Sequence, residues 1–177
     1  MTPIQDCIQN RNTKIKPIWI MRQAGRYLPE FREIRSKNPD FIRLCLNENL
    51  VGEITLQPIK RFNFDAAIIF SDILMLPYGL GQEVKFEKGL GPKLGKLDLD
   101  LIANVSVNEF SKKLNPTYKS ISDISSNPIC KNKDVIGFVG APWTILVYMV
   151  NKMSPKKILS IEIFNDRLLI NKLLFII

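Results

Sequence analysis

The stretch from Asp65 to Phe70 reads DAAIIF and is followed at once by Ser71 and Asp72. After its first residue the run is continuously apolar, which is typical of a strand covered on both faces of a parallel sheet. The preceding segment, Glu48 to Phe62, has the apolar spacing of a helix, and Pro58 is expected to kink or break it. A helix that leads into a buried strand predicts alternating β/α architecture.

Two further apolar runs fit the same pattern. Pro17 to Met21 (PIWIM) and Asp134 to Val139 (DVIGFV) are predicted strands. Further helices are predicted over residues 29–37, 40–46, 117–126, 144–150 and 154–177, and the glycine-rich region 79–97 is predicted to be a hairpin or loop. Three apolar strands separated by helices predict a parallel β/α sheet.

Each predicted strand ends in a polar or glycine-rich corner. The corners contain Arg22 and Arg26 around Gly25, then Asp72, then Gly140. Because function in β/α proteins sits beyond the carboxyl ends of the strands, we expect all three corners on one face. Taken singly, each corner also has a plain structural interpretation. The arginines fit a solvated surface, Asp72 fits a helix cap, and Tyr148 after the third corner fits the core.

The charge of +8 suggests a nucleic-acid or membrane-surface partner, but the lysines are scattered and form no block. The arginines are clustered: five of the eight fall within 22 positions. These five are Arg22, Arg26, Arg32, Arg35 and Arg43. Arginine pairs with carboxylates in a planar, bidentate geometry. The cluster therefore favours carboxylate recognition, although a solvated helix face would account for some of these arginines. No nucleic-acid or membrane partner is expected.

The chain contains no histidine, which excludes Ser-His-Asp and Cys-His nucleophile systems and removes the commonest zinc ligand. Its three cysteines, Cys7, Cys45 and Cys130, lie far apart and are predicted to be small buried hydrophobic residues. The apolar runs are too short for a signal peptide or a membrane span, so the expected location is the cytoplasm.

Three long motifs, taken together, resemble the signatures of the uroporphyrinogen decarboxylase family. They are MRQAGRYLPEFR from Met21, LQPIKRFNFDAAIIFSDIL from Leu56 and GFVGAPWTILVYM from Gly137, in the family's order and at similar separations. The resemblance covers nearly the whole chain. It implies a (β/α)8 TIM barrel, of which residues 1–177 would be the amino-terminal portion, and a cytoplasmic homodimer without cofactor or metal.

The resemblance also implies an activity and a site. The family removes four acetate carboxyls from uroporphyrinogen III to give coproporphyrinogen III, a step of heme biosynthesis. Arg22, Gln23, Ala24, Gly25 and Arg26 match its substrate-carboxylate loop. Asp72 matches the aspartate that faces the four pyrrole N–H groups and stabilises the cationic transition state, and Tyr148 matches a substrate-contacting tyrosine. The proton donor stays open between a loop arginine and a bound water.

Two other functions compete with this one. A methyltransferase of the same barrel superfamily would need a zinc-binding cluster of His and Cys, and a non-catalytic basic RNA- or membrane-binding module would explain only the charge. The family's substrate-binding serine and histidine belong to its carboxyl-terminal half, which has no counterpart here. A barrel needs about 250 residues and eight strands. The 177 residues alone are therefore expected to be an inactive, aggregation-prone fragment.

Overall fold

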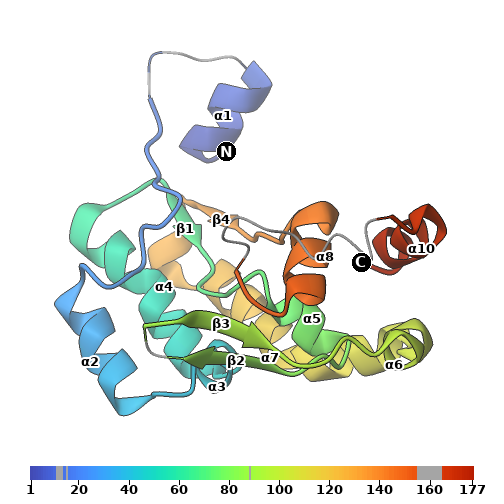
Figure 1. The fold of residues 1–177 in the computed structure, drawn as a ribbon. Coiled ribbons are helices and arrows are strands. Elements are labelled where there is room, and N and C mark those ends of the chain that lie inside the picture. The colour runs from blue at the N-terminus through green and yellow to red at the C-terminus, as the bar shows by residue number, and fades with distance from the viewer. Residues whose placement is uncertain (11–13, 15, 88, 155–164) are drawn as a thin grey trace. The chain divides into compact units, whose positions relative to one another are not determined.

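The computed structural model describes residues 1–10, 14, 16–87, 89–154 and 165–177, and these residues form two compact units. Unit 1 comprises Met1–Pro39, Arg43–Ser71 and Asn115–Phe138, and unit 2 comprises Asp40–Ile42, Asp72–Leu114 and Val139–Ile177. The elements, labelled in Figure 1, are α1 (Pro3–Asn10), α2 (Pro29–Lys37), α3 (Phe41–Cys45), α4 (Glu48–Phe62), β1 (Ala66–Ile68), α5 (Met75–Gly79), β2 (Val84–Glu87), β3 (Gly91–Leu94), α6 (Leu99–Asn104), α7 (Val107–Ser125), a 3-10 turn (Pro128–Cys130), β4 (Asp134–Ile136), α8 (Pro142–Asn151) and α10 (Arg167–Ile176).

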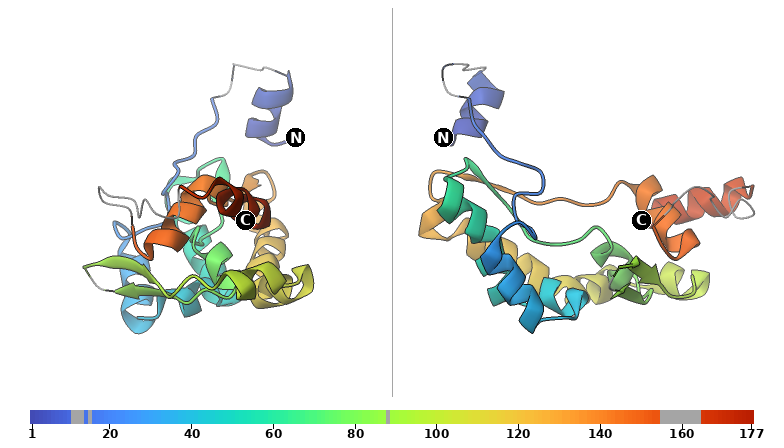
Figure 2. Two further views of the ribbon diagram at one scale, coloured as in Figure 1. Left: turned by 45° about the vertical axis from the view of Figure 1, so that its right-hand side comes forward. Right: turned by 60° about the vertical axis from the view of Figure 1, so that its left-hand side comes forward.

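Unit 1 is built on two parallel strands. β1 pairs with β4 in the register Ala66 to Asp134 and Ile68 to Ile136. Helix α4 packs against β1, as both views of Figure 2 show. Its inward side chains join those of β1 in the core, which consists of Val51, Leu56, Ile59, Ala67, Ile69, Ile124 and Cys130. The parallel pair with its covering helix confirms the predicted β/α class.

Unit 2 contains an antiparallel hairpin and a packed pair of helices. β2 and β3 form the hairpin that the glycine-rich region predicts, and Gly91, the first residue of β3, has a φ of 90°, which favours glycine. Helix α8 packs against α10 through Leu146, Val150, Ile170 and Leu173. Helix α5 also packs against α8.

The predicted strand from Pro17 to Met21 was wrong, because no strand forms there. The segment meets the sheet at one residue, where Ile18 N donates to Asp65 Oδ2 at 2.7 Å and Asp65 N donates to Ile18 O at 2.9 Å. Two residues later the backbone turns, since Gln23 N donates to Ile20 O at 2.9 Å. The turn takes the chain away from β1 before a ladder can form, and the side chains from Ile18 to Met21 are exposed.

Helix α2 has the predicted limits, and α4 continues through a buried Pro58 without the expected break. The helix predicted over residues 117–126 is the end of the longer α7. In the region predicted as one helix over 154–177, Ser154 is not helical, residues 155–164 lie outside the described part, and α10 supplies the end. Cys45 and Cys130 are buried as predicted, whereas Cys7 is half-exposed.

Within the described residues, no helix combines the length and the apolar character that crossing a bilayer requires. The same residues contain no group of three or more His, Cys, Asp and Glu side chains that could hold a metal ion.

Candidate functional site

The first corner is a loop in unit 1 that runs from Arg22 to Leu28 and leads into α2. Leu28 N donates to Gly25 O at 3.0 Å, which closes a turn, and the Leu28 side chain is fully buried. Arg22 and Arg26 are both exposed. Within the described part of the chain, neither guanidinium makes a hydrogen bond or an ion pair. Both side chains are therefore available to bind an anion.

Gln23 occupies the same loop but is buried, with only 1% of its surface exposed. Its Nε2 donates to Ala66 O at 2.8 Å, and its Oε1 accepts from Ile20 N at 3.2 Å. Both ends of the amide are thus engaged by the backbone of unit 1. The amide fastens the loop to the first residue of β1, a contact that the sequence does not reveal.

Ala24 and Gly25 are partly exposed between the two arginines. A Cβ placed on Gly25 would lie 3.8 Å from Arg22 O and 4.0 Å from the Tyr27 ring, which are ordinary contact distances. Gly25 is not among the glycines with positive φ. The fold itself therefore does not require glycine at this position, and the open backbone is accessible to a ligand.

Two further side chains, outside the predicted site residues, brace the loop. The Tyr27 hydroxyl donates to Gln23 O, and the Tyr27 ring stacks on Phe62 of α4 with centroids 6.3 Å apart. Arg32 of α2 donates from Nη1 to Arg26 O at 2.8 Å and to Tyr27 O at 3.1 Å. The sequence signal for Arg32 is its membership in the arginine cluster.

The second corner places Asp72 in unit 2, on the turn before α5. Its Oδ1 accepts from Leu74 N at 2.8 Å, and its carbonyl accepts from Met75 N at 3.1 Å. The carboxylate is half-buried and has no ion-pair partner among the described residues. Burial raises its pKa above the ordinary value, and the hydrogen bond from Leu74 N opposes that rise. Asp72 thus combines a local turn contact with unused acceptor capacity, and it does not cap α5, whose N-cap residue is Leu74.

The third corner lies in unit 2 and begins α8. Gly140 is buried, and α8 starts at Pro142, whose ring fits the first helical turn. Tyr148 is half-buried in the second half of this helix. Because α5 packs against α8, unit 2 brings the helices that follow the second and third corners together. Arg22 and Arg26 belong to unit 1.

The two strands of unit 1 that precede the second and third corners in the sequence are in parallel register. Ile69 N donates to Ile136 O at 3.0 Å, so the two strands end level with each other before the second and third corners. The first corner does not follow a strand. Its contact with the sheet is the bond from Gln23 Nε2 to Ala66 O, at the first residue of β1. The segment before it bonds through Ile18 to Asp65, which precedes β1.

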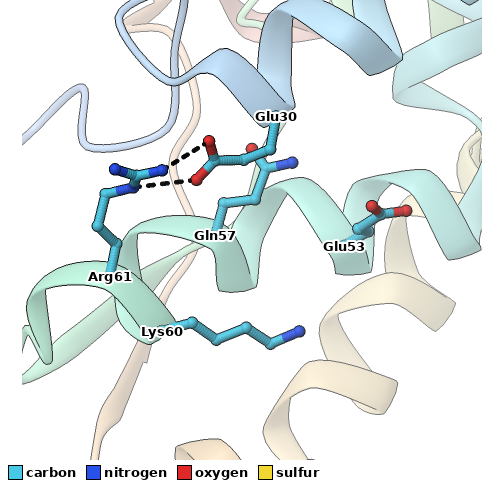
Figure 3. Close-up of a pocket in the computed structure, with 5 residues that line it drawn as sticks. All are labelled: Glu30, Glu53, Gln57, Lys60 and Arg61. Carbon is cyan, nitrogen blue, oxygen red and sulfur yellow. Dashed lines mark hydrogen bonds and ion pairs between the residues drawn. The ribbon is translucent and has the colours of Figure 1, made fainter.

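A hollow in unit 1 lies apart from the predicted site residues. It is about 430 Å³ in volume and is lined by Glu30 of α2 and by Glu53, Gln57, Lys60 and Arg61 of α4. Figure 3 shows Arg61 bound to Glu30 by two hydrogen bonds, of 3.1 Å and 2.9 Å. Arg61 and Glu30 neutralise each other's charge and join α4 to α2. The hollow therefore follows from how these two helices pack.

The comparison with protein families decides the identity of the fold. The family model described as uroporphyrinogen decarboxylase (URO-D) matches residues 1–173. This chain belongs to the uroporphyrinogen decarboxylase family. The family implies a TIM barrel, of which the described residues contain the parallel pair β1 and β4 with its helices.

Curated relatives agree with the family model. The chain is 45% identical to a protein of Chelativorans sp. (strain BNC1) over 145 residues, which are 82% of this chain and 42% of the relative. It is 47% identical over 134 residues to proteins of Brucella anthropi and Brucella ovis, covering 76% of this chain and 39% of each relative. All three are named uroporphyrinogen decarboxylase. The chain thus spans about two fifths of the length of the curated relatives it matches.

Proposed function

We propose that this chain forms the amino-terminal part of a uroporphyrinogen decarboxylase that converts uroporphyrinogen III to coproporphyrinogen III. The observation that supports this most is the pair of exposed, unpartnered guanidinium groups of Arg22 and Arg26 on a braced loop, as far as the described residues extend. The substrate carries eight carboxylates, and the planar guanidinium is suited to bind them. A cytoplasmic homodimer that needs no cofactor or metal completes the proposal.

The reaction needs an electron sink, which the substrate can supply itself. Protonation of a pyrrole ring carbon places positive charge on the adjacent nitrogen. The bond between the acetate methylene and its carboxyl carbon then breaks, carbon dioxide leaves, and the bonding electrons neutralise the cation. A proton added to the methylene and a proton lost from the ring carbon give the methyl group. The net change is one proton consumed and one carbon dioxide released for each arm.

Asp72 is proposed to stabilise the cation. Its carboxylate is desolvated and has acceptor capacity beyond the bond from Leu74 N. The pyrrole N–H groups of the substrate would supply donors and would offset the burial that raises its pKa. A preorganised group that meets developing charge lowers the barrier by about 3–4 kcal/mol. Tyr148 is proposed to contact the macrocycle from α8.

The test uses a chimera in which this chain is joined to the part of the Brucella anthropi relative beyond the matched segment. Asp72→Asn keeps an acceptor for Leu74 N but removes the charge, so we expect near-normal substrate affinity and turnover reduced about 100-fold or more. Coproporphyrin formed after oxidation of the product, separated by chromatography, measures turnover. Asp98→Asn is the matched control, because Asp98 Oδ1 caps α6 through Leu101 N at 3.0 Å. Near-normal turnover by Asp72→Asn would remove Asp72 from the mechanism.

A further inference from the structure

We infer that Arg32 is a positioning residue that fixes the backbone between Arg22 and Leu28 so that the two exposed arginines can bind substrate carboxylates. The inference rests on the proposed function. Arg32 lies one turn into α2 and donates from a single nitrogen, Nη1, to the carbonyls of Arg26 and Tyr27, at 2.8 Å and 3.1 Å. Its guanidinium is thus bonded to the backbone of the loop, whereas those of Arg22 and Arg26 have no partner in the described part of the chain.

The loop is held at both ends, and Arg32 is the second anchor. At the first end Gln23 binds the β1 backbone through Ala66 O. At the second end Leu28, the residue before α2, has no side chain that can cap the helix. A charged donor shared by two neighbouring carbonyls supplies directional bonds at this point. Ala24, Gly25 and Arg26 lie between the two anchors.

Anchoring the loop lowers the cost of binding. A loop that is already ordered loses less conformational freedom when a ligand arrives, so its affinity is higher than that of the same contacts on a loose loop. Displacement of a binding group by about 1 Å can cost about 100-fold in rate. Loss of the Arg32 bonds should therefore weaken ligand binding without removing any group that touches the ligand.

The experiment compares Arg32→Met, Arg32→Lys and Lys37→Met with the parent chimera. Met keeps an unbranched apolar chain but removes the donors and the charge, and Lys keeps the charge and a donor that can reach the carbonyls. Lys37 lies on the same helix, and its ammonium binds Glu33 at 2.7 Å, so Lys37→Met controls for loss of one positive charge. The probe is uroporphyrin III, the oxidised octacarboxylate, titrated by fluorescence. Hydrogen exchange of peptides covering residues 22–28 gives a second readout.

We expect Arg32→Met to bind uroporphyrin at least about tenfold more weakly and to exchange faster in the loop, with Arg32→Lys in between and Lys37→Met within about twofold of the parent. Arg32 is exposed, so each variant should fold. If Arg32→Met does not fold, the comparison of Arg32→Lys with the parent tests the inference. Weaker binding with unchanged exchange would make Arg32 a direct ligand and overturn the inference, as would Arg32→Met and Lys37→Met binding equally. A parent that shows no saturable binding contradicts the proposed function instead. In that case unchanged loop exchange in Arg32→Met separately overturns the role of Arg32.

Discussion

Asp72 is a carboxylate whose surroundings penalise its charge, and this makes stability depend on pH. Its pKa in the folded chain is raised by burial, so folding favours the protonated form. The corresponding stability is present in full below the ordinary aspartate pKa of about 4 and is lost as pH rises through the folded value. Above that value the ionised side chain destabilises the fold.

We therefore expect Asp72→Asn to melt at a higher temperature than the parent at pH 7, because the amide carries no charge and still accepts from Leu74 N. The advantage should shrink as pH falls and disappear below about pH 4. Thermal melts of the chimera from about pH 3 to about pH 8 measure this difference in melting temperature. A difference in melting temperature that is constant across this range would assign the effect to packing. Asp98→Asn, at an exposed cap, should show no such gain at pH 7.

Gly25 is a position at which a substitution should change ligand binding more than it changes the stability of the fold. A Cβ at this position meets only ordinary contacts, so Gly25→Ala should change the free energy of unfolding by less than about 0.5 kcal/mol. If carboxylates approach the backbone between Arg22 and Arg26, the added methyl should weaken uroporphyrin binding several-fold.

Gly52→Ala is the matched control for Gly25→Ala, because Gly52 lies inside α4 and nothing stands within 4 Å of its Cβ position. It should stabilise the helix by up to about 1 kcal/mol and leave affinity unchanged. Equal uroporphyrin affinity in Gly25→Ala and the parent would show that the ligand does not approach Gly25.

At the residue scale the sequence predicts which side chains are chemically able to bind carboxylates, but not which of them the fold uses internally. Arg22 and Gln23 are neighbours in one motif. One is exposed without a described partner, and the other is 1% exposed with both amide ends bonded. The difference arises from a contact with Ala66, 43 positions later. The residues around Gln23 in the sequence do not predict such a contact.

At the scale of elements, the third corner depends on the absence of a side chain. A Cβ on Gly140 would lie 2.4 Å from Ile145 Cδ1, 2.8 Å from Ile145 Cγ1 and 3.1 Å from Ile73 Cβ. Ile145 is fully buried on α8, so it cannot swing into solvent.

We expect Gly140→Ala to destabilise the protein by about 1–3 kcal/mol, the usual cost of overpacking. The double variant Gly140→Ala with Ile145→Val removes the shortest of these contacts and should recover part of the loss. Denaturant unfolding of the chimera compares the two single variants and the double variant with the parent. Gly137→Ala, where nothing lies within 4 Å, is the control and should be much less affected. Simple additivity of the two single changes would mean that the added methyl group does not collide with Ile145.

The elements that the sequence predicts well are those with local signals. Helix α4 begins where Asn47 caps Leu50 N and ends at Asn63, which has a left-handed φ of 53°. Helix α7 has an equally clear start, since Ser106 and Glu109 form a reciprocal capping box, but Pro116 inside the helix obscures it in the sequence.

The segment from Pro17 to Met21 shows the opposite case. Its apolar pattern is correct for a strand, yet a strand forms only when a neighbour supplies its ladder. Here the backbone of Ile20 bonds with Gln23 instead. The apolar pattern of a segment does not predict whether a strand tens of residues away will pair with it.

At the scale of the whole molecule, the buried runs predict the parallel β/α class because both faces of such strands are covered. Long motifs predict the family, which the match over residues 1–173 confirms. Neither predicts closure of the barrel, because closure depends on strands that these motifs do not contain. Among the described residues the parallel sheet consists of β1 and β4.

The last prediction concerns the apolar surface that this sheet leaves uncovered. Within unit 1, Ile18, Trp19, Ile20 and Met21 are 58%, 43%, 54% and 75% exposed, and Phe138, beyond β4, is 47% exposed. A contiguous apolar run beside a strand with an unpaired edge favours self-association. The relatives are more than twice as long as the segment matched here, and the chimera adds that further length.

We therefore expect the 177 residues alone to bind a hydrophobic dye strongly, to aggregate on warming and to form no coproporphyrinogen, whereas the chimera should melt cooperatively and bind little dye. Replacing Ile18 and Ile20 with Thr should reduce dye binding by the isolated chain. Ile8→Thr is the control, since Ile8 is 73% exposed on α1 and outside that run. A sharp cooperative melt of the isolated chain together with substrate turnover would contradict the prediction. It would mean that this apolar surface needs no cover.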